Sequence, residues 1–137
     1  MLIQDKLEVL LIEDDRIEVL KLKRAISNEY DNYSLSLASN GNEALQLLEN
    51  NLPDMILLDL NMPDTNGIEF LSILKNNEDL KHIPVIVLTT SNNNKDIYEC
   101  YKLGIAGYII KPLKYEDYEC KIRTIMDYWS QNEFLKP

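Results

Sequence analysis

Four short apolar runs, each ended by a polar side chain, constrain the fold of this chain most strongly. The runs are Val9–Ile12, Met55–Leu58, Val85–Leu88 and Tyr108–Ile110. Their length and their aliphatic residues are typical of buried strands. Segments with apolar residues at helical spacing lie between them, so strand and helix patterns alternate along the chain. This alternation predicts βαβ units, in which helices connect parallel strands.

A fifth, weaker strand completes the predicted sheet. The segment Tyr33–Leu37 alternates and contains β-formers, which suits an edge strand. Asn40 is the predicted N-cap of the next helix, and Gly104 is predicted to follow the end of a later one. A loop is predicted at Asn61–Gly67 from its turn residues. The predicted fold is therefore (βα)5, a doubly wound, five-stranded parallel sheet between two helical layers.

Length and composition limit the kinds of protein that the chain can be. Its 137 residues fit one domain, 1–137, with a core over about 7–129, a frayed end after Trp129 and no separate output domain. A net charge of −9 disfavours direct nucleic-acid binding. No segment approaches the ~20 apolar residues of a membrane span, and no signal-peptide layout is found, so a cytoplasmic location is expected. Cys100 and Cys120 are expected to be free, buried or half-buried thiols.

Polar residues follow the four apolar runs directly: Glu13 and Asp14, then Asp59, Thr89 and Lys111. Ligands of open parallel sheets bind at the carboxyl ends of the strands, so these side chains are expected to converge. Carboxylates brought together repel each other, and a hard cation such as Mg²⁺ removes this penalty. A hydroxyl and an ammonium at the same place suit a phosphoryl group. A helix-capping or surface role for Asp59 is disfavoured, because burial of a lone charge is costly.

Taken together, these pieces resemble the receiver domain of two-component response regulators. The resemblance covers the chain from Leu7 to about Trp129. It rests on four motifs in order: Leu-Leu-Ile-Glu13-Asp14-Asp15, Leu-Leu-Asp59-Leu-Asn61-Met62-Pro63, Val-Leu-Thr89-Thr90-Ser91 and Gly107-Tyr108-Ile-Ile-Lys111-Pro112. The second and third motifs, with the late Trp129, look most like the stand-alone receivers that accompany phytochrome-type sensor kinases. The implied architecture is the flavodoxin-like three-layer sandwich of receivers.

The resemblance implies a role for each of these polar residues. Asp59 would accept the phosphoryl group, Lys111 would reach Asp59 and the phosphoryl oxygens, and the Thr89 hydroxyl would donate to a phosphoryl oxygen. Mg²⁺ would be coordinated by Asp14 and Asp59 directly, by Glu13 through water, and by one backbone carbonyl. That carbonyl belongs to Asn61. The peptide between Lys111 and Pro112 would be cis.

Tyr108 is the aromatic switch that the resemblance implies, a ring that turns inward when Thr89 moves toward phosphate. Ordinary packing of Tyr108 against its strand is the alternative, and the residues alone do not separate the two. Ile97 and Tyr101 would flank this ring. Together with Tyr108 and the last helix, they would form the output surface.

The function implied by the resemblance is a phosphorylation-controlled signalling switch. Its phosphoryl donor would be a sensor histidine kinase, of the phytochrome type, or a phosphotransfer protein. The signal would leave through a downstream protein or through self-association as a homodimer. Such a protein is no metabolic enzyme and performs only self-catalysed phosphoryl transfer and slow autodephosphorylation.

Three other functions are open alternatives. A phosphorylation-independent adaptor with a relic site is disfavoured, because all the expected groups are present. A flavin-binding electron carrier of this architecture would need a phosphate-cradling loop where the chain has Glu13, Asp14 and Asp15. An aspartyl-phosphate phosphohydrolase commonly has a second Asp two residues after the nucleophile, where this chain has Asn61.

Overall fold

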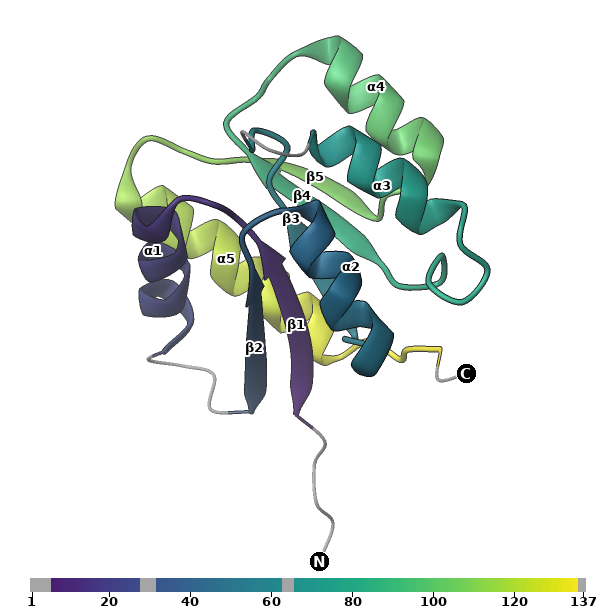
Figure 1. Cartoon of the computed structure of the whole chain (residues 1–137). Coiled ribbons are helices and arrows are strands. Elements are labelled where there is room, and N and C mark those ends of the chain that lie inside the picture. Colours follow the sequence, from purple (N-terminus) through teal and green to yellow (C-terminus); the bar gives the residue numbers. More distant parts are fainter. Residues whose placement is uncertain (1–5, 28–31, 63–65, 136–137) are drawn as a thin grey trace, which may run out of the picture.

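The computed structural model describes residues 6–27, 32–62 and 66–135 of the chain (Figure 1). Strands and helices alternate throughout these residues, as the sequence predicts. The elements in chain order are β1 (Leu7–Ile12), α1 (Arg16–Ser27), β2 (Tyr33–Ala38), α2 (Gly41–Asn50), β3 (Met55–Leu58), α3 (Gly67–Lys75), β4 (Val85–Thr89), α4 (Asn94–Leu103), β5 (Gly107–Ile110) and α5 (Tyr115–Ser130).

The strands form one parallel sheet in the order β2-β1-β3-β4-β5. The predicted (βα)5 fold is therefore confirmed, with β2 at an edge as expected. The strand β1 begins at Leu7, two residues before the apolar run, because its pairing with β2 continues to Leu7 opposite Tyr33. Order reverses between β1 and β3, which places the carboxyl ends of these two strands at a crevice where ligands bind in such sheets.

Two hydrophobic cores cover the two faces of the sheet. Side chains of a strand point alternately to opposite faces, and in β3 Ile56 and Leu58 enter one core while Met55 and Leu57 enter the other. The first core includes buried residues of α2, α3 and α4, and the second includes buried residues of α1 and α5. Figure 1 shows this division, with α1 and α5 on one side of the sheet. The helices thereby leave the carboxyl ends of the central strands to the loops.

Local capping explains where several helices begin and end. The Asn40 side chain accepts a hydrogen bond of 2.8 Å from the Glu43 N–H, so its predicted role as N-cap is confirmed. Gly104 ends α4 with a φ of 99°, a left-handed conformation that glycine adopts without strain. Asn66 also caps a helix, α3, by accepting a hydrogen bond of 2.8 Å from the Ile68 N–H, and α3 already begins at Gly67. Part of the loop predicted at Asn61–Gly67, residues 63–65, lies outside the described residues.

The end of the chain differs from the sequence prediction. The helix ends at Ser130, and instead of fraying, the segment that follows is held by stacking of the Phe134 ring on the Trp129 ring, with centroids 6.1 Å apart. Both rings pack against the core beneath α1 and α5. The contact between these two half-buried rings stabilises the segment, an effect that the polar residues between them conceal in the sequence.

Two further expectations concern single features. Both cysteines are free, as expected, and Cys100 is buried, but the expectation that Cys120 is at least half-buried is wrong, because this residue lies on the exposed face of α5. Among the described residues, no helix is both long and apolar enough to cross a bilayer.

Candidate functional site

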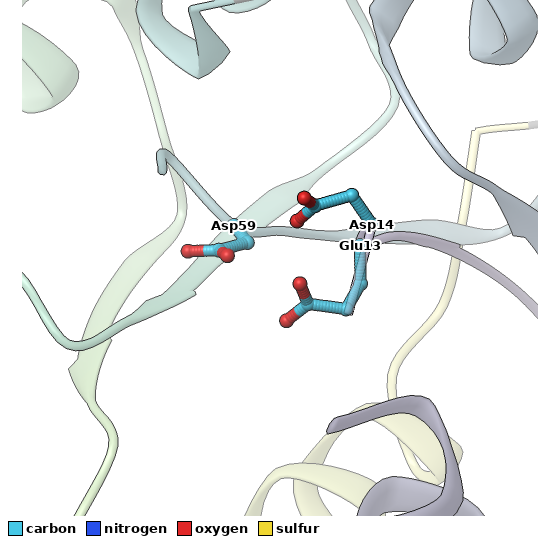
Figure 2. Close-up of side chains that lie close together, drawn as sticks. All are labelled: Glu13, Asp14 and Asp59. Atoms are coloured by element: carbon cyan, nitrogen blue, oxygen red, sulfur yellow. The ribbon is translucent and has the colours of Figure 1, made fainter. Parts of the chain in front are cut away.

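Three carboxylates meet at the carboxyl ends of β1 and β3. Glu13 and Asp14 follow Ile12, Asp59 follows Leu58, and Ile12 lies opposite Leu58 in the pairing of the two strands. One carboxylate oxygen of each acid lies within 4.8 Å of those of the other two. Figure 2 shows the side chains of Glu13 and Asp14 extending toward Asp59. The register of two neighbouring strands therefore creates the cluster.

The carboxylates differ in their access to water. Glu13 and Asp59 are only 6% and 7% exposed, whereas Asp14 is exposed. Burial raises the pKa of Glu13 to about 7, and the negative charge of Asp59 acts in the same direction. The nearby Lys111 ammonium opposes this rise. The cluster of carboxylates is therefore too poorly solvated for all of its negative charges to be stable without a compensating cation.

Lys111 follows β5 and brings a positive charge to the same place. Its Nζ donates a hydrogen bond of 2.7 Å to Glu13 Oε1 and lies 3.7 Å from Glu18 Oε2. The contact predicted from the resemblance was with Asp59, and the structure shows Lys111 paired with Glu13 instead. Burial by itself would lower the pKa of Lys111, but the Glu13 hydrogen bond and the charge of Asp59 raise it overall. The ammonium therefore keeps its charge beside the carboxylates.

The expected cis peptide before Pro112 is wrong. Among the residues that the structure describes, every peptide bond is trans. The trans form is favoured for X–Pro bonds in general, and the backbone N–H of Lys111 reaches Thr89 O at 2.8 Å in this arrangement.

The hydroxyl of Thr89 and the amide of Asn61 lie at the opposite side of Asp59 from β1. Thr89 is the last residue of β4 and is fully buried. Asn61 Nδ2 lies 3.4 Å from Thr89 Oγ1, and the Asn61 N–H donates to Asp59 Oδ1 at 3.3 Å. Both contacts are longer than a typical hydrogen bond, so each stabilises this arrangement only weakly.

Tyr108 connects β5 with the loop that follows β4. Its hydroxyl donates a 2.9 Å hydrogen bond to the backbone carbonyl of Ser91, and its half-buried ring packs against the core under α3 and α4. Burial raises the pKa of its hydroxyl. The Ser91 hydroxyl in turn donates to Asp96 Oδ2 in the first turn of α4 at 2.8 Å. A continuous set of hydrogen bonds thus connects this ring with α4.

Two residues at the site were missed in the sequence interpretation. Gly67 was assigned only to a loop, yet a Cβ at this position would lie 2.7 Å from Leu60 Cα and 2.8 Å from the Asp59 carbonyl oxygen. Glu18 was not considered at all. Its place in the first helical turn after Glu13 and Asp14 was the signal that could have identified it.

This set of residues fits a divalent cation and a phosphoryl group. Hard divalent cations prefer oxygen ligands, and Mg²⁺ combines one or two carboxylates with waters. Three mutually repelling carboxylates supply these ligands, and a cation would relieve the repulsion. Lys111 and Thr89 are the types of group that bind phosphoryl oxygens.

Comparison with known proteins relates the chain to response regulators. The family model described as the response regulator receiver domain matches residues 9–123. The response regulator Rcp1 of Synechocystis is 32% identical over 134 residues, which are 93% of this chain and 91% of Rcp1. A probable methanogenesis regulatory protein, FilR2 of Methanothrix harundinacea, is 35% identical over 92% of this chain and 85% of its own length.

Solved structures show the same relationship. The phosphorylated cyanobacterial phytochrome response regulator RcpA is similar with a TM-score of 0.89 and 30% identity, over 96% of this chain and 99% of that chain. The Mn²⁺-bound form of Rcp1 gives a TM-score of 0.87 and 31% identity, over 95% and 99% of the two chains.

Proposed function

Because the chain belongs to the response regulator receiver domain family, we propose that it is a signalling switch that accepts a phosphoryl group on Asp59. One observation carries the proposal: the Asp59 carboxylate lies among those of Glu13 and Asp14, and the Lys111 ammonium is hydrogen-bonded to Glu13 in the same cluster. Asp59 is nearly buried directly after β3, a place where a carboxylate without a chemical role would destabilise the fold.

The proposed reaction is transfer from a phosphohistidine to a carboxylate. An Asp59 carboxylate oxygen forms the new bond to phosphorus while the bond to the imidazole nitrogen of the donor breaks. The imidazole leaves with the electron pair of that bond. Bound Mg²⁺ would supply neutralisation of negative charge on the phosphoryl group and on the carboxylates.

Residues of the chain have distinct tasks in this proposal. Asp14 and Asp59 would hold the cation directly, Glu13 would hold it through water, and the Asn61 backbone carbonyl would complete the protein ligands. The Mn²⁺-bound relative supports such a site. Lys111 would bind a phosphoryl oxygen as a positive charge.

The Thr89 hydroxyl would donate to another phosphoryl oxygen, and this contact would produce the switch. Its weak contacts with Asn61 and with the Ser91 N–H, both 3.4 Å, would be exchanged for a stronger one to phosphate. Since the phosphoryl group would contact only one arrangement of Thr89 well, it would shift the equilibrium toward that arrangement. Tyr108 is hydrogen-bonded to the backbone carbonyl of Ser91 in the loop after β4, and it would transmit the change to α4 and β5.

The proposed donor is a sensor histidine kinase or a phosphotransfer protein. A phytochrome-type kinase is favoured by the likeness to RcpA, which is described as a phytochrome response regulator. We propose a single receiver domain that signals to a downstream protein or by self-association in the cytoplasm, without direct contact with nucleic acid. The surface around Tyr101 and Tyr108 would carry this output.

Labelling with a small phosphodonor tests the proposal. Acetyl phosphate with Mg²⁺ is expected to add one phosphoryl group per chain to the wild type and to Asp15→Asn. Asp59→Asn is expected to stay unlabelled, as is the wild type without divalent cation. Intact-protein mass spectrometry measures all four samples. An unlabelled wild type that binds its partner would instead support an adaptor that acts without phosphorylation.

A further inference from the structure

Glu18 lies on α1 with one carboxylate oxygen in an unusual position. The side chain is 24% exposed as a whole, but Oε2 is inaccessible to water and has no hydrogen-bond partner among the described residues. A buried carboxylate oxygen without partners is costly, so its surroundings must compensate it. An acid that only favoured the helix dipole in the first turn would turn to solvent.

Two ammonium groups provide this compensation. Glu18 Oε2 lies 3.6 Å from Lys21 Nζ and 3.7 Å from Lys111 Nζ. Lys21 is itself held in place, since its Nζ lies 4.6 Å from the centre of the fully buried Tyr118 ring. Lys21 therefore stays at α1, whereas Lys111 is the ammonium that must act at Asp59.

Lys111 lies between Glu13, which follows β1, and Glu18 on α1. Its hydrogen bond goes to Glu13, and Glu18 is its second anionic neighbour within 4 Å. Asp59 attracts it electrostatically without a direct contact. A phosphoryl group on Asp59 would compete with both glutamates for the Lys111 ammonium.

We propose that Glu18 is a positioning residue that holds Lys111 toward α1 in the unphosphorylated state and thereby slows phosphoryl capture at Asp59. This inference depends on the proposed function, because it assigns Lys111 its task there. In this inference Glu18 acts through the ammonium of Lys111 and not on Asp59 itself. The chain thus has its own restraint on reactivity, independent of any kinase.

The test uses three variants of the full chain and a donor that makes no protein contact. Glu18→Gln removes the charge and keeps the size, Glu18→Asp keeps the charge on a shorter arm, and Asp15→Asn removes a charge near the same site. Asn at position 15 retains the acceptor oxygen that receives the Ile17 N–H at 2.9 Å. The initial rate of labelling by acetyl phosphate with Mg²⁺ is measured for each variant and for the wild type.

Glu18→Gln is expected to raise the labelling rate about fivefold, the size of effect given by a partly exposed ion pair. Glu18→Asp is expected to restore most of the wild-type rate. Asp15→Asn is expected to change the rate by less than about twofold, since exposed charges are well screened. An unchanged or lower rate for Glu18→Gln overturns the inference. An equal rise for Asp15→Asn does so too, because it would show a general effect of charge.

A second readout does not depend on phosphorylation. The ¹⁵N resonance of the Lys111 ammonium, observed by NMR, is expected to shift in Glu18→Gln and to stay in place in Asp15→Asn. An unmoved resonance in Glu18→Gln refutes the positioning role whatever the labelling shows. Failure of the wild type to accept a phosphoryl group at all would refute the proposed function and leave the resonance to decide on Glu18.

Discussion

Replacement of Gly67 by alanine should damage both stability and phosphoryl transfer. The new Cβ would lie 2.7 Å from Leu60 Cα and 2.8 Å from the Asp59 carbonyl oxygen, and both atoms belong to backbone that cannot rotate away. To reach the 3.4 Å of ordinary contact, the start of α3 and the end of β3 must separate by roughly 0.7 Å. The residues that must move include the proposed phosphoacceptor itself.

The expected cost follows from this separation. An extra methyl group in a tightly packed place typically costs ~1–3 kcal/mol of stability. Alanine recovers at most ~1 kcal/mol of that through its higher helix propensity. We therefore expect Gly67→Ala to lower the free energy of unfolding by about 1–2 kcal/mol. Labelling of Asp59 should fall at least about threefold, because small displacements of reacting groups are expensive.

Urea unfolding followed by circular dichroism measures the stability, and mass spectrometry measures the labelling. Gly107→Ala is the matched control, since a Cβ there would come no closer than 3.9 Å to the nearest atom, a methyl carbon of Ile86. Its stability should stay within about 0.5 kcal/mol of the wild type. If Gly67→Ala has the same urea midpoint of unfolding and the same labelling of Asp59 as the wild type, the reasoning is refuted, and the close contact between α3 and β3 matters for neither stability nor phosphoryl transfer.

Three further predictions concern pH, metal binding and output. Because the pKa of Glu13 is raised from 4.5 to about 7, the folded state keeps a proton that the unfolded chain releases. Stability without divalent cation should therefore fall as pH rises from about 4.5 to 7, and thermal unfolding should show a smaller fall for Glu13→Gln. Calorimetric titration should show that Asp14→Ala weakens Mg²⁺ binding more than Glu13→Ala does. The loss of affinity in Glu13→Ala should be about tenfold, as expected for a partner that binds the cation through water. Equal losses of affinity in the two variants would contradict the ligand assignment. Sedimentation should show that a phosphoryl analogue promotes association of the wild type but not of Tyr101→Ala, and an equal response would remove Tyr101 from the output surface.

The fold could be predicted from the sequence because its signals are local. Each central strand is a short apolar run, and a parallel sheet buried on both faces requires such runs. The N-cap at Asn40 and the left-handed Gly104 depend on neighbouring residues only, so they too were predictable. The convergence of the polar residues after β1 and β3 was predictable as well, because ligand sites of parallel sheets lie at the carboxyl ends of the strands.

Contacts between distant parts of the chain were harder to predict. The sequence predicted that Lys111 lies near Asp59, but not its pairing with Glu13, because a choice among three carboxylates depends on side-chain geometry. The stacking of Phe134 on Trp129 joins residues on either side of a polar segment, and such a segment is typical of a frayed chain end. The close approach at Gly67 depends on the path of the backbone after β3, for which a single glycine in a loop is a weak indication.

Chemical mapping of the phosphorylated residue tests the central claim most directly. Borohydride reduces an acyl phosphate to the alcohol, so an aspartyl phosphate is converted to homoserine at the residue that carried it. After treatment of the wild type with acetyl phosphate and Mg²⁺, peptide sequencing by mass spectrometry should find homoserine at position 59 and at no other aspartate. Homoserine at position 14 or at another acid, or none anywhere in a labelled protein, would contradict the account.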